Sequence, residues 1–167
     1  MRRSQQYSVD ERDLQLIKYL EEDGRRPWSE IAGLMNVSEA TVYLRVKRLL
    51  DNGVLNGFTA RIDPRMLGLT STAFLLVRAR ADAIKGVRES LSRLPFVAEA
   101  YETTGPYNFL LKVLAPSQDD LSRAVEEVAS IPGVLEISSI MTLSELRRAS
   151  SLSSIYEYWL KAGGREA

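Results

Sequence analysis

The first sixty residues carry apolar side chains at helical spacing. Apolar positions recur three or four residues apart in three short stretches, which predicts three helices joined by tight turns. The expected caps are Asp10, Ser29 and Ser38, and the expected stops are Gly24, Asn36 and Gly53. This arrangement is typical of a helix-turn-helix domain, which we place at residues 1–60.

The segment after the third predicted helix has a weaker pattern. Residues 54–62 alternate weakly around Gly57, which favours a strand or wing that leads into a linker at residues 61–70. The Asp63–Pro64 step biases the backbone away from helix and marks a boundary between two domains.

The second half of the chain mixes strand and helix periods. Strands are predicted at residues 72–80, 97–103, 107–114 and 134–143. Helices are predicted from two apolar faces, one with Ile84, Val87, Leu91 and Leu94 and one with Leu121, Val125 and Val128. The order strand, helix, strand, strand, helix, strand predicts a ferredoxin-like βαββαβ domain at residues 71–148. The fold class is therefore α+β, with a (winged) helix-turn-helix domain first.

Residues 149–167 predict a C-terminal helical extension. Ser154 and Glu157 have the spacing of a capping box, and Gly163–Gly164 would stop the helix. The apolar stripe consists of Leu152, Ile155, Tyr156 and Trp159. A helix with such a stripe needs a surface to cover, and we expect it to pack on its own domain. The alternatives are that it seals the sheet, crosses to a neighbouring subunit or plugs an effector site.

The third predicted helix has two distinct faces. With Val46 at the centre of the buried face, Val42, Leu49 and Leu50 fall within about 60° of it. The residues that then point outward are Ala40, Thr41, Leu44, Lys47 and Arg48. Small, hydroxyl and cationic side chains on one face fit the major groove of double-stranded DNA.

Individual residues of this region have competing interpretations. Leu44 would contact a thymine methyl or a sugar, or else pack against the wing or a partner chain. Arg45 lies at the flank of the helix and suits a phosphate or an internal ion pair. Arg25 and Arg26 are candidates for phosphate contacts, although turn arginines are often simply solvated. Ser38, at the start of the helix, completes the candidate DNA-binding set.

Composition limits the possible functions. The 22 basic and 22 acidic residues cancel, so attraction to nucleic acid must come from a local patch, and Arg45, Lys47 and Arg48 form one without acidic neighbours in residues 40–50. The longest apolar run, residues 73–77, is too short to span a bilayer, so we expect a cytoplasmic protein with no membrane partner. The absence of cysteine and histidine argues against an enzyme, a metal site or a cofactor.

Several motifs together resemble the Lrp/AsnC (feast/famine) transcriptional regulators. One is a D-x-x-D-L-x-I-x-x-L pattern from Asp10 to Leu20. A second is V-S-x-x-T-V-x-x-R-V-x-R/K-L from Val37 to Leu49, followed by G-V-x-x-G-F/Y-T. The resemblance extends over residues 9–148 and includes the ferredoxin-like half. It implies that this half senses a ligand and dimerises, that homodimers assemble into tetramers or octamers, and that amino acids bind between subunits.

Two features of the second half bear on those implications. The strand at residues 107–114 is apolar on both faces, with Phe109 and Leu111 opposite Leu110 and Leu114, which calls for a partner subunit unless insertions or the tail cover one face. The effector loop that the resemblance implies follows a G-D-Y/F-D pattern. It comprises Thr104, Gly105, Pro106, Tyr107 and Asn108.

Two positions of this loop depart from the family pattern. Pro106 lacks a backbone N–H that could hold a carboxylate, and Asn108 lacks a charge that could hold an ammonium group. We therefore expect an uncharged or otherwise different effector, or none. A tight hairpin without a ligand is the structural alternative.

The resulting hypothesis is a sequence-specific regulator that binds double-stranded DNA as a dimer or higher oligomer and responds to an amino acid or another small effector. The alternative is an architectural DNA-binding protein without effector control. An enzyme is a further rival, because the resemblance extends to relatives with this architecture that act as decarboxylases on modified tetrapyrroles. Such chemistry would be expected to use histidine, which the chain lacks.

Overall fold

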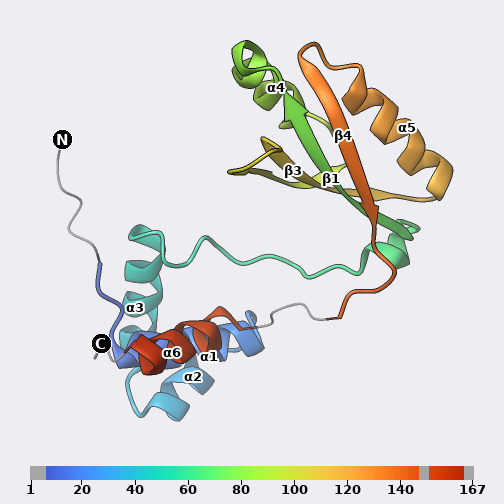
Figure 1. Cartoon of the computed structure of the whole chain (residues 1–167). Helices are drawn as coiled ribbons and strands as arrows, with labels where there is room; N and C mark the ends of the chain where they lie inside the picture. Colours follow the sequence, from blue (N-terminus) through green and yellow to red (C-terminus); the bar gives the residue numbers. More distant parts are fainter. Residues whose placement is uncertain (1–6, 147–150, 164–167) are drawn as a thin grey trace. The chain divides into compact units, whose positions relative to one another are not determined.

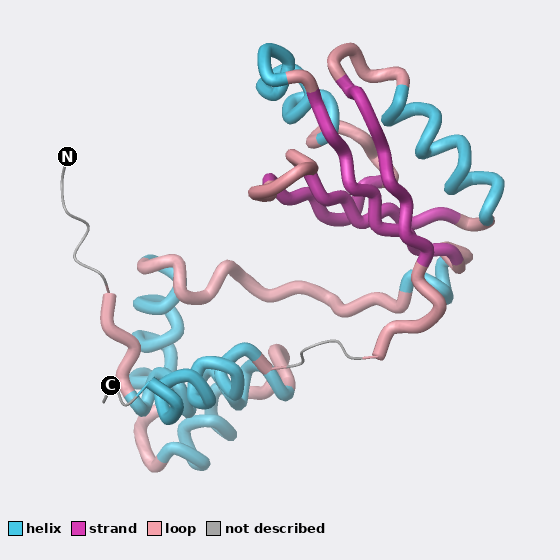
Figure 2. Tube along the Cα trace, viewed as in Figure 1, coloured by secondary structure: helices cyan, strands magenta, loops and turns pink. Residues whose placement is uncertain are grey.

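The computed structural model describes residues 7–146 and 151–163. The chain divides into two compact units: Met1–Ala60 together with Arg147–Ala167, and Arg61–Leu146. Within the described residues all four strands lie in the second unit, and the first unit has no strand (Figure 2). No helix among the described residues is both long and apolar enough to cross a membrane.

The first unit is built on three helices, α1 (Glu11–Glu22), α2 (Trp28–Met35) and α3 (Glu39–Asp51). The predicted caps at Asp10 and Ser38 are confirmed, because their side chains accept the N–H groups of the third residue of α1 and α3. Asn36 ends α2 in the left-handed conformation, as expected. The predicted cap at Ser29 is wrong: α2 begins at Trp28 after Pro27, whose fixed φ suits a helix start without a side-chain cap.

The core of the first unit lies between these helices. Its buried residues are Leu16, Leu20, Ile31, Ala32, Met35, Val42, Val46 and Leu49. Leu50 was expected in this core but is exposed, whereas Arg45 on the opposite flank is mostly covered. The centre of the buried face therefore lies about 40° from Val46, toward Val42 and Leu49.

The strand or wing predicted at residues 54–62 is wrong. After Gly53, which has a φ of 69°, the N–H groups of Val54 and Leu55 donate to the carbonyl of Leu49 at 2.9 and 3.1 Å. Both side chains then pack on the helical core. These two residues satisfy their backbone and apolar groups at the end of α3, which leaves no local reason to form a strand.

The second unit has a four-stranded antiparallel sheet. After a 3-10 turn, η1 (Pro64–Leu67), the order is β1 (Ser71–Ala79), a second 3-10 turn, η2 (Ala81–Ala83), α4 (Ile84–Leu91), β2 (Val97–Glu102), β3 (Phe109–Ala115), α5 (Gln118–Ala129) and β4 (Val134–Met141). The strands are arranged β2-β3-β1-β4 with antiparallel neighbours (Figure 1). This arrangement confirms the predicted ferredoxin-like βαββαβ fold.

Both helices of the second unit cover the same face of its sheet. The alternate residues Ala73, Leu75 and Val77 of β1 are buried in one cluster with Val87 of α4 and Val128 of α5. The opposite face carries partly exposed apolar side chains, and no helix among the described residues of this unit covers it. These side chains are Phe74, Leu76, Leu110, Leu114 and Ile140.

The C-terminal extension forms α6 (Leu152–Gly163) and belongs to the first unit, where it packs against α1. The predicted capping box is wrong, because the helix begins before Ser154 and the hydroxyl of Ser151 accepts the Ser154 N–H at 3.2 Å. Glu157, the other half of that pair, binds Lys18 of α1 instead, at 2.5 Å.

Candidate nucleic-acid interface

The outward face of α3 contains four of the nine predicted DNA-binding residues. Ala40, Leu44 and Lys47 are exposed, and Thr41 is partly exposed. Leu44 is 62% exposed, in contrast to the buried leucine at position 49 of the same helix. Lys47 forms no ion pair with any residue that the structure describes. This face is therefore open to a ligand.

The first turn of α3 also contributes hydroxyl groups. Ser38 Oγ and Thr41 Oγ1 lie 2.8 Å apart and share a hydrogen bond, in addition to the Ser38 cap. Tyr43 is exposed beside this face, and its ring lies 5.3 Å from that of Trp28 in α2. Tyr43 was not among the predicted site residues.

Arg45 and Arg48 point toward α1. Arg45 Nη1 lies 2.9 Å from Asp10 Oδ2 and 2.6 Å from Asp13 Oδ1. Arg48 Nη2 lies 3.0 Å from each carboxylate oxygen of Asp13. Arg45 therefore has the internal ion pair that was one of its two expected roles. Arg48 is exposed, as predicted, but its side chain also pairs with the buried Asp13, which was not predicted.

Asp13 is the centre of this network and is fully buried. Its carboxylate also accepts the hydroxyl of Tyr7 at 2.6 Å and the N–H of Asp10 at 3.3 Å. The guanidinium carbon of Arg48 lies 5.2 Å from the centre of the Tyr7 ring. Burial, and then the hydrogen bond to Asp13, raise the pKa of Tyr7, which stays a hydrogen-bond donor. Two carboxylates and two guanidinium groups thus balance in charge across the α1–α3 contact.

This network could have been anticipated from spacing. Asp10 and Asp13 are three residues apart, and so are Arg45 and Arg48, so two matching pairs can meet when the helices pack side by side. The D-x-x-D motif was visible in the sequence, but its partners were not assigned. Burial raises the pKa of Asp10, but hydrogen bonds from Arg45 and Asp13 outweigh it, so the pKa lies below its ordinary value.

The two turn arginines have different environments. Arg25 is exposed. Arg26 is 19% exposed, and it contacts Glu22 at 3.3 Å, Glu30 at 3.5 Å and the Tyr19 ring. Arg26 is therefore not simply solvated, and it links α1 to α2.

The predicted effector loop forms a hairpin between β2 and β3. Thr104, Gly105 and Pro106 are exposed at its tip, and Gly105 has a φ of 115°. Asn108 is occupied by the sheet: its Oδ1 accepts the N–H of Ala79 at 2.8 Å. This bond lies where the pairing of β1 with β4 shifts, between Arg78 and Ala79. The amide of Asn108 thus has a structural role at an irregularity that periodicity does not reveal.

A charged pair lies next to this loop. The hydroxyl of Tyr107 donates to Glu136 at 3.2 Å, and Arg78 Nη2 contacts the same carboxylate at 2.6 Å. The hydrogen bond from Arg78, followed by that from Tyr107, lowers the pKa of Glu136. Sequence analysis did not predict Arg78 or Glu136, because they come from β1 and β4 and meet only in the folded sheet.

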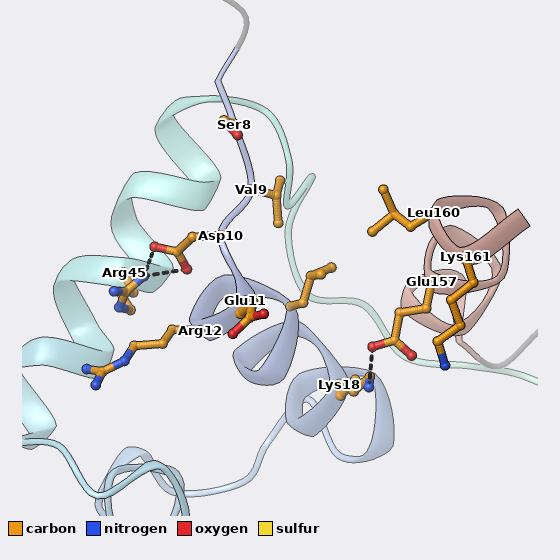
Figure 3. Close-up of a pocket in the computed structure, with 11 residues that line it drawn as sticks. Ser8, Val9, Asp10, Glu11, Arg12, Lys18, Arg45, Glu157, Leu160 and Lys161 are labelled. Carbon is orange, nitrogen blue, oxygen red and sulfur yellow. Dashed lines mark hydrogen bonds and ion pairs between the residues drawn. The ribbon is translucent and has the colours of Figure 1, made fainter. Parts of the chain in front are cut away.

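A groove of about 1200 Å³ lies between α1 and α6 within the first unit (Figure 3). Its walls mix acidic, basic and apolar side chains, and its charged groups include the Asp10–Arg45 and Lys18–Glu157 pairs. Among the described residues no group of three potential ligands could hold a metal ion.

Models of known families match both units of the chain. Residues 9–50 match the AsnC-type helix-turn-helix domain, and residues 72–152 match the Lrp/AsnC ligand binding domain. The chain belongs to the Lrp/AsnC family. This membership confirms the resemblance inferred from the motifs at Asp10–Leu20 and Val37–Leu49.

Similar proteins agree with this membership. The HTH-type transcriptional regulator FL11 of Pyrococcus horikoshii is 34% identical over 144 residues, which cover 86% of this chain and 95% of that protein. A transcriptional regulator from Neisseria meningitidis, solved in complex with L-methionine, has a TM-score of 0.81 at 26% identity, covering 87% of this chain and 96% of its own. AsnC of E. coli has a TM-score of 0.81 at 25% identity, covering 87% and 100%. This Lrp/AsnC protein is a transcriptional regulator with a helix-turn-helix domain and a ligand-binding domain.

Proposed function

We propose that this Lrp/AsnC regulator binds specific double-stranded DNA sequences by placing the outward face of α3 in the major groove. The observation that carries this proposal is the exposed surface of Ala40, Thr41, Leu44 and Lys47, which has no packing role in the first unit. Leu44 is suited to a thymine methyl, and Thr41 and Lys47 to base edges.

Arg45 and Arg48 would have a different role in the complex. Both are held against α1, but the side chain of Arg48 is 46% exposed and can face a phosphate while it stays paired with Asp13. The turns of the first unit can approach the sugar-phosphate backbone of DNA, and these turns carry Arg25, Arg26 and Ser38. Phosphate contacts of this kind would fix the register of α3 on the duplex.

The proposed active form is a homodimer. The chain has a net charge of zero, so one monomer gains little from non-specific attraction, and two α3 helices about one turn of DNA apart would be needed. The uncovered apolar face of the sheet, with Phe74, Leu76 and Leu110, is a suitable dimer surface. Further assembly into tetramers or octamers would follow the family.

The proposed effector differs from an ordinary amino acid, or is absent. The Neisseria regulator was solved with L-methionine, which supports an amino-acid site in that protein. In this protein the effector site would be lined by Thr104, Gly105, Pro106 and Tyr107 of the loop. The Oδ1 atom of Asn108 already accepts the N–H of Ala79. Calorimetry against the common amino acids tests this point, and micromolar binding of an ordinary zwitterion would contradict it.

Selection of bound DNA from a random pool tests the main proposal. A regulator should enrich a roughly palindromic sequence, and footprints should cover spaced half-sites. Coating of DNA without sequence preference would instead support the architectural alternative. Lys47→Ala should weaken binding to the selected site. The charge-matched control is Arg12→Ala at an exposed position of α1, which should weaken binding less.

A further inference from the structure

Helix α6 docks on α1 through its polar face. Ser153 is buried, and Glu157 and Leu160 are partly buried, so the face in contact follows the i, i+4, i+7 spacing of one helix side. The apolar stripe that includes Tyr156 and Trp159 is exposed instead. The contact between α6 and α1 therefore combines polar side chains with Leu160 and leaves the apolar stripe uncovered.

Glu21 of α1 holds the first turn of α6. Its carboxylate accepts the N–H of Leu152 at 2.6 Å and the hydroxyls of Ser151 and Ser153 at 2.9 and 2.5 Å. The first N–H groups of a helix have no partner within the helix, and an acidic group there also stabilises the helix dipole. Glu21 is thus a capping residue supplied by a segment about 130 positions away in the chain.

A second contact lies farther along both helices. Lys18 Nζ is 2.5 Å from Glu157 Oε1, about one and a half turns into α6 (Figure 3). Lys18 and Glu21 are three residues apart, so one side of α1 carries both contacts to α6. The N-terminal turn of α1 meanwhile holds Arg45 and Arg48 through Asp10 and Asp13.

The connectivity gives this docking a consequence. The second unit begins at Arg61 and ends at Leu146, and the chain then returns to the first unit. The ligand-binding domain is therefore attached to the DNA-binding domain at both of its ends. The match to the family model stops at residue 152, so family membership assigns no role to α6.

We propose that α6 is a strap that holds α1 of the same chain in place and, through Asp13 of α1, steadies the arginines of the recognition helix. This inference rests on the proposed DNA-binding function. A loosened strap frees α1, and Asp10 and Asp13 then hold Arg45 and Arg48 less firmly. DNA binding weakens as a result.

Hydrogen exchange of the full-length protein tests the docking step. A twelve-residue helix is marginal by itself in water, so its amides are protected only while α6 is docked. Glu21→Gln should speed exchange of the α6 amides about tenfold, because it removes a charged acceptor. Glu22→Gln, the matched control, removes the same charge one residue away, where Glu22 pairs only with Arg26 among described residues. Equal α6 exchange in both variants would overturn the docking step.

A charge exchange gives an independent check. Lys18→Glu alone should speed α6 exchange, and its combination with Glu157→Lys should restore protection. The natural protein can be assembled from a mixture of light-isotope and heavy-isotope chains and then treated with carbodiimide. The crosslink between Lys18 and Glu157 should then form only within one chain. Mixed-isotope products would overturn the same-chain strap and indicate an exchange of α6 between subunits.

Affinity for the selected DNA tests the coupling step. Glu21→Gln should weaken binding about three- to tenfold relative to the natural protein. Faster α6 exchange with unchanged affinity would overturn the coupling. Failure of the natural protein to bind any selected DNA would contradict the proposed function instead, and the exchange result would still decide whether α6 docks.

Discussion

Replacement of Asp13 by asparagine tests whether the buried carboxylate holds α1 to α3. The change keeps the shape of the side chain but removes the charge that faces Arg45 and Arg48. Removing one partner of a buried ion pair costs about 3–5 kcal/mol. Arg45 keeps Asp10, and Arg48 is 46% exposed and can turn into water, so we expect a smaller loss of about 2–3 kcal/mol.

The same change at Asp10 is the control. Asp10 is half exposed, and asparagine is an equally good N-cap, so Asp10→Asn should cost less than about 1 kcal/mol. Unfolding of the first unit can be followed by the fluorescence of Trp28, which packs on its core, in a Trp159→Phe background. If Asp13→Asn and Asp10→Asn lower the free energy of unfolding equally, the central role assigned to Asp13 is wrong.

Three further predictions concern other parts of the molecule. Lys47→Ala should lower affinity for the selected DNA about tenfold and leave the melting temperature unchanged, whereas Arg48→Ala should lower both, as gel shifts and thermal melts would reveal. Asn108→Ala should destabilise the second unit by about 1–2 kcal/mol in denaturant titrations, because the Ala79 N–H loses its acceptor, and an unchanged midpoint would contradict that role. Burial raises the pKa of Glu21, but hydrogen bonds from Ser153, Ser151 and the first α6 amides lower it by more. The pKa of Glu21 therefore lies below its ordinary value of 4.5. Docking of α6 should therefore hold at pH values above 4.5 and weaken as the pH falls below it, and this loss, followed by hydrogen exchange, should be smaller in Glu21→Gln.

The pattern of apolar residues was sufficient for the helices α1–α6, the strands β1–β4 and their order, but it also predicted a strand or wing at residues 54–62 that the structure does not contain. Caps such as Asp10 and Ser38 are local, and they were predicted correctly. A helical wheel does not show which neighbouring helix contacts a flank, so the ion pair of the exposed Arg48 with Asp13 was not predicted. The face that α6 buries depends on Glu21, which lies on another helix. Such pairings between distant segments leave no periodic signal in the sequence.

The exposed residues of α3 and its two paired arginines differ in how mutation can change operator preference. Ala40, Leu44 and Lys47 lie outside the helical core, so substitutions there alter the surface offered to DNA with little cost in folding. Arg45 and Arg48 belong to a charge-balanced network with Asp13, and a change in either must be matched on α1. With the proposed interface, a change of operator preference through these three positions would cost less folding stability than a change through the two arginines.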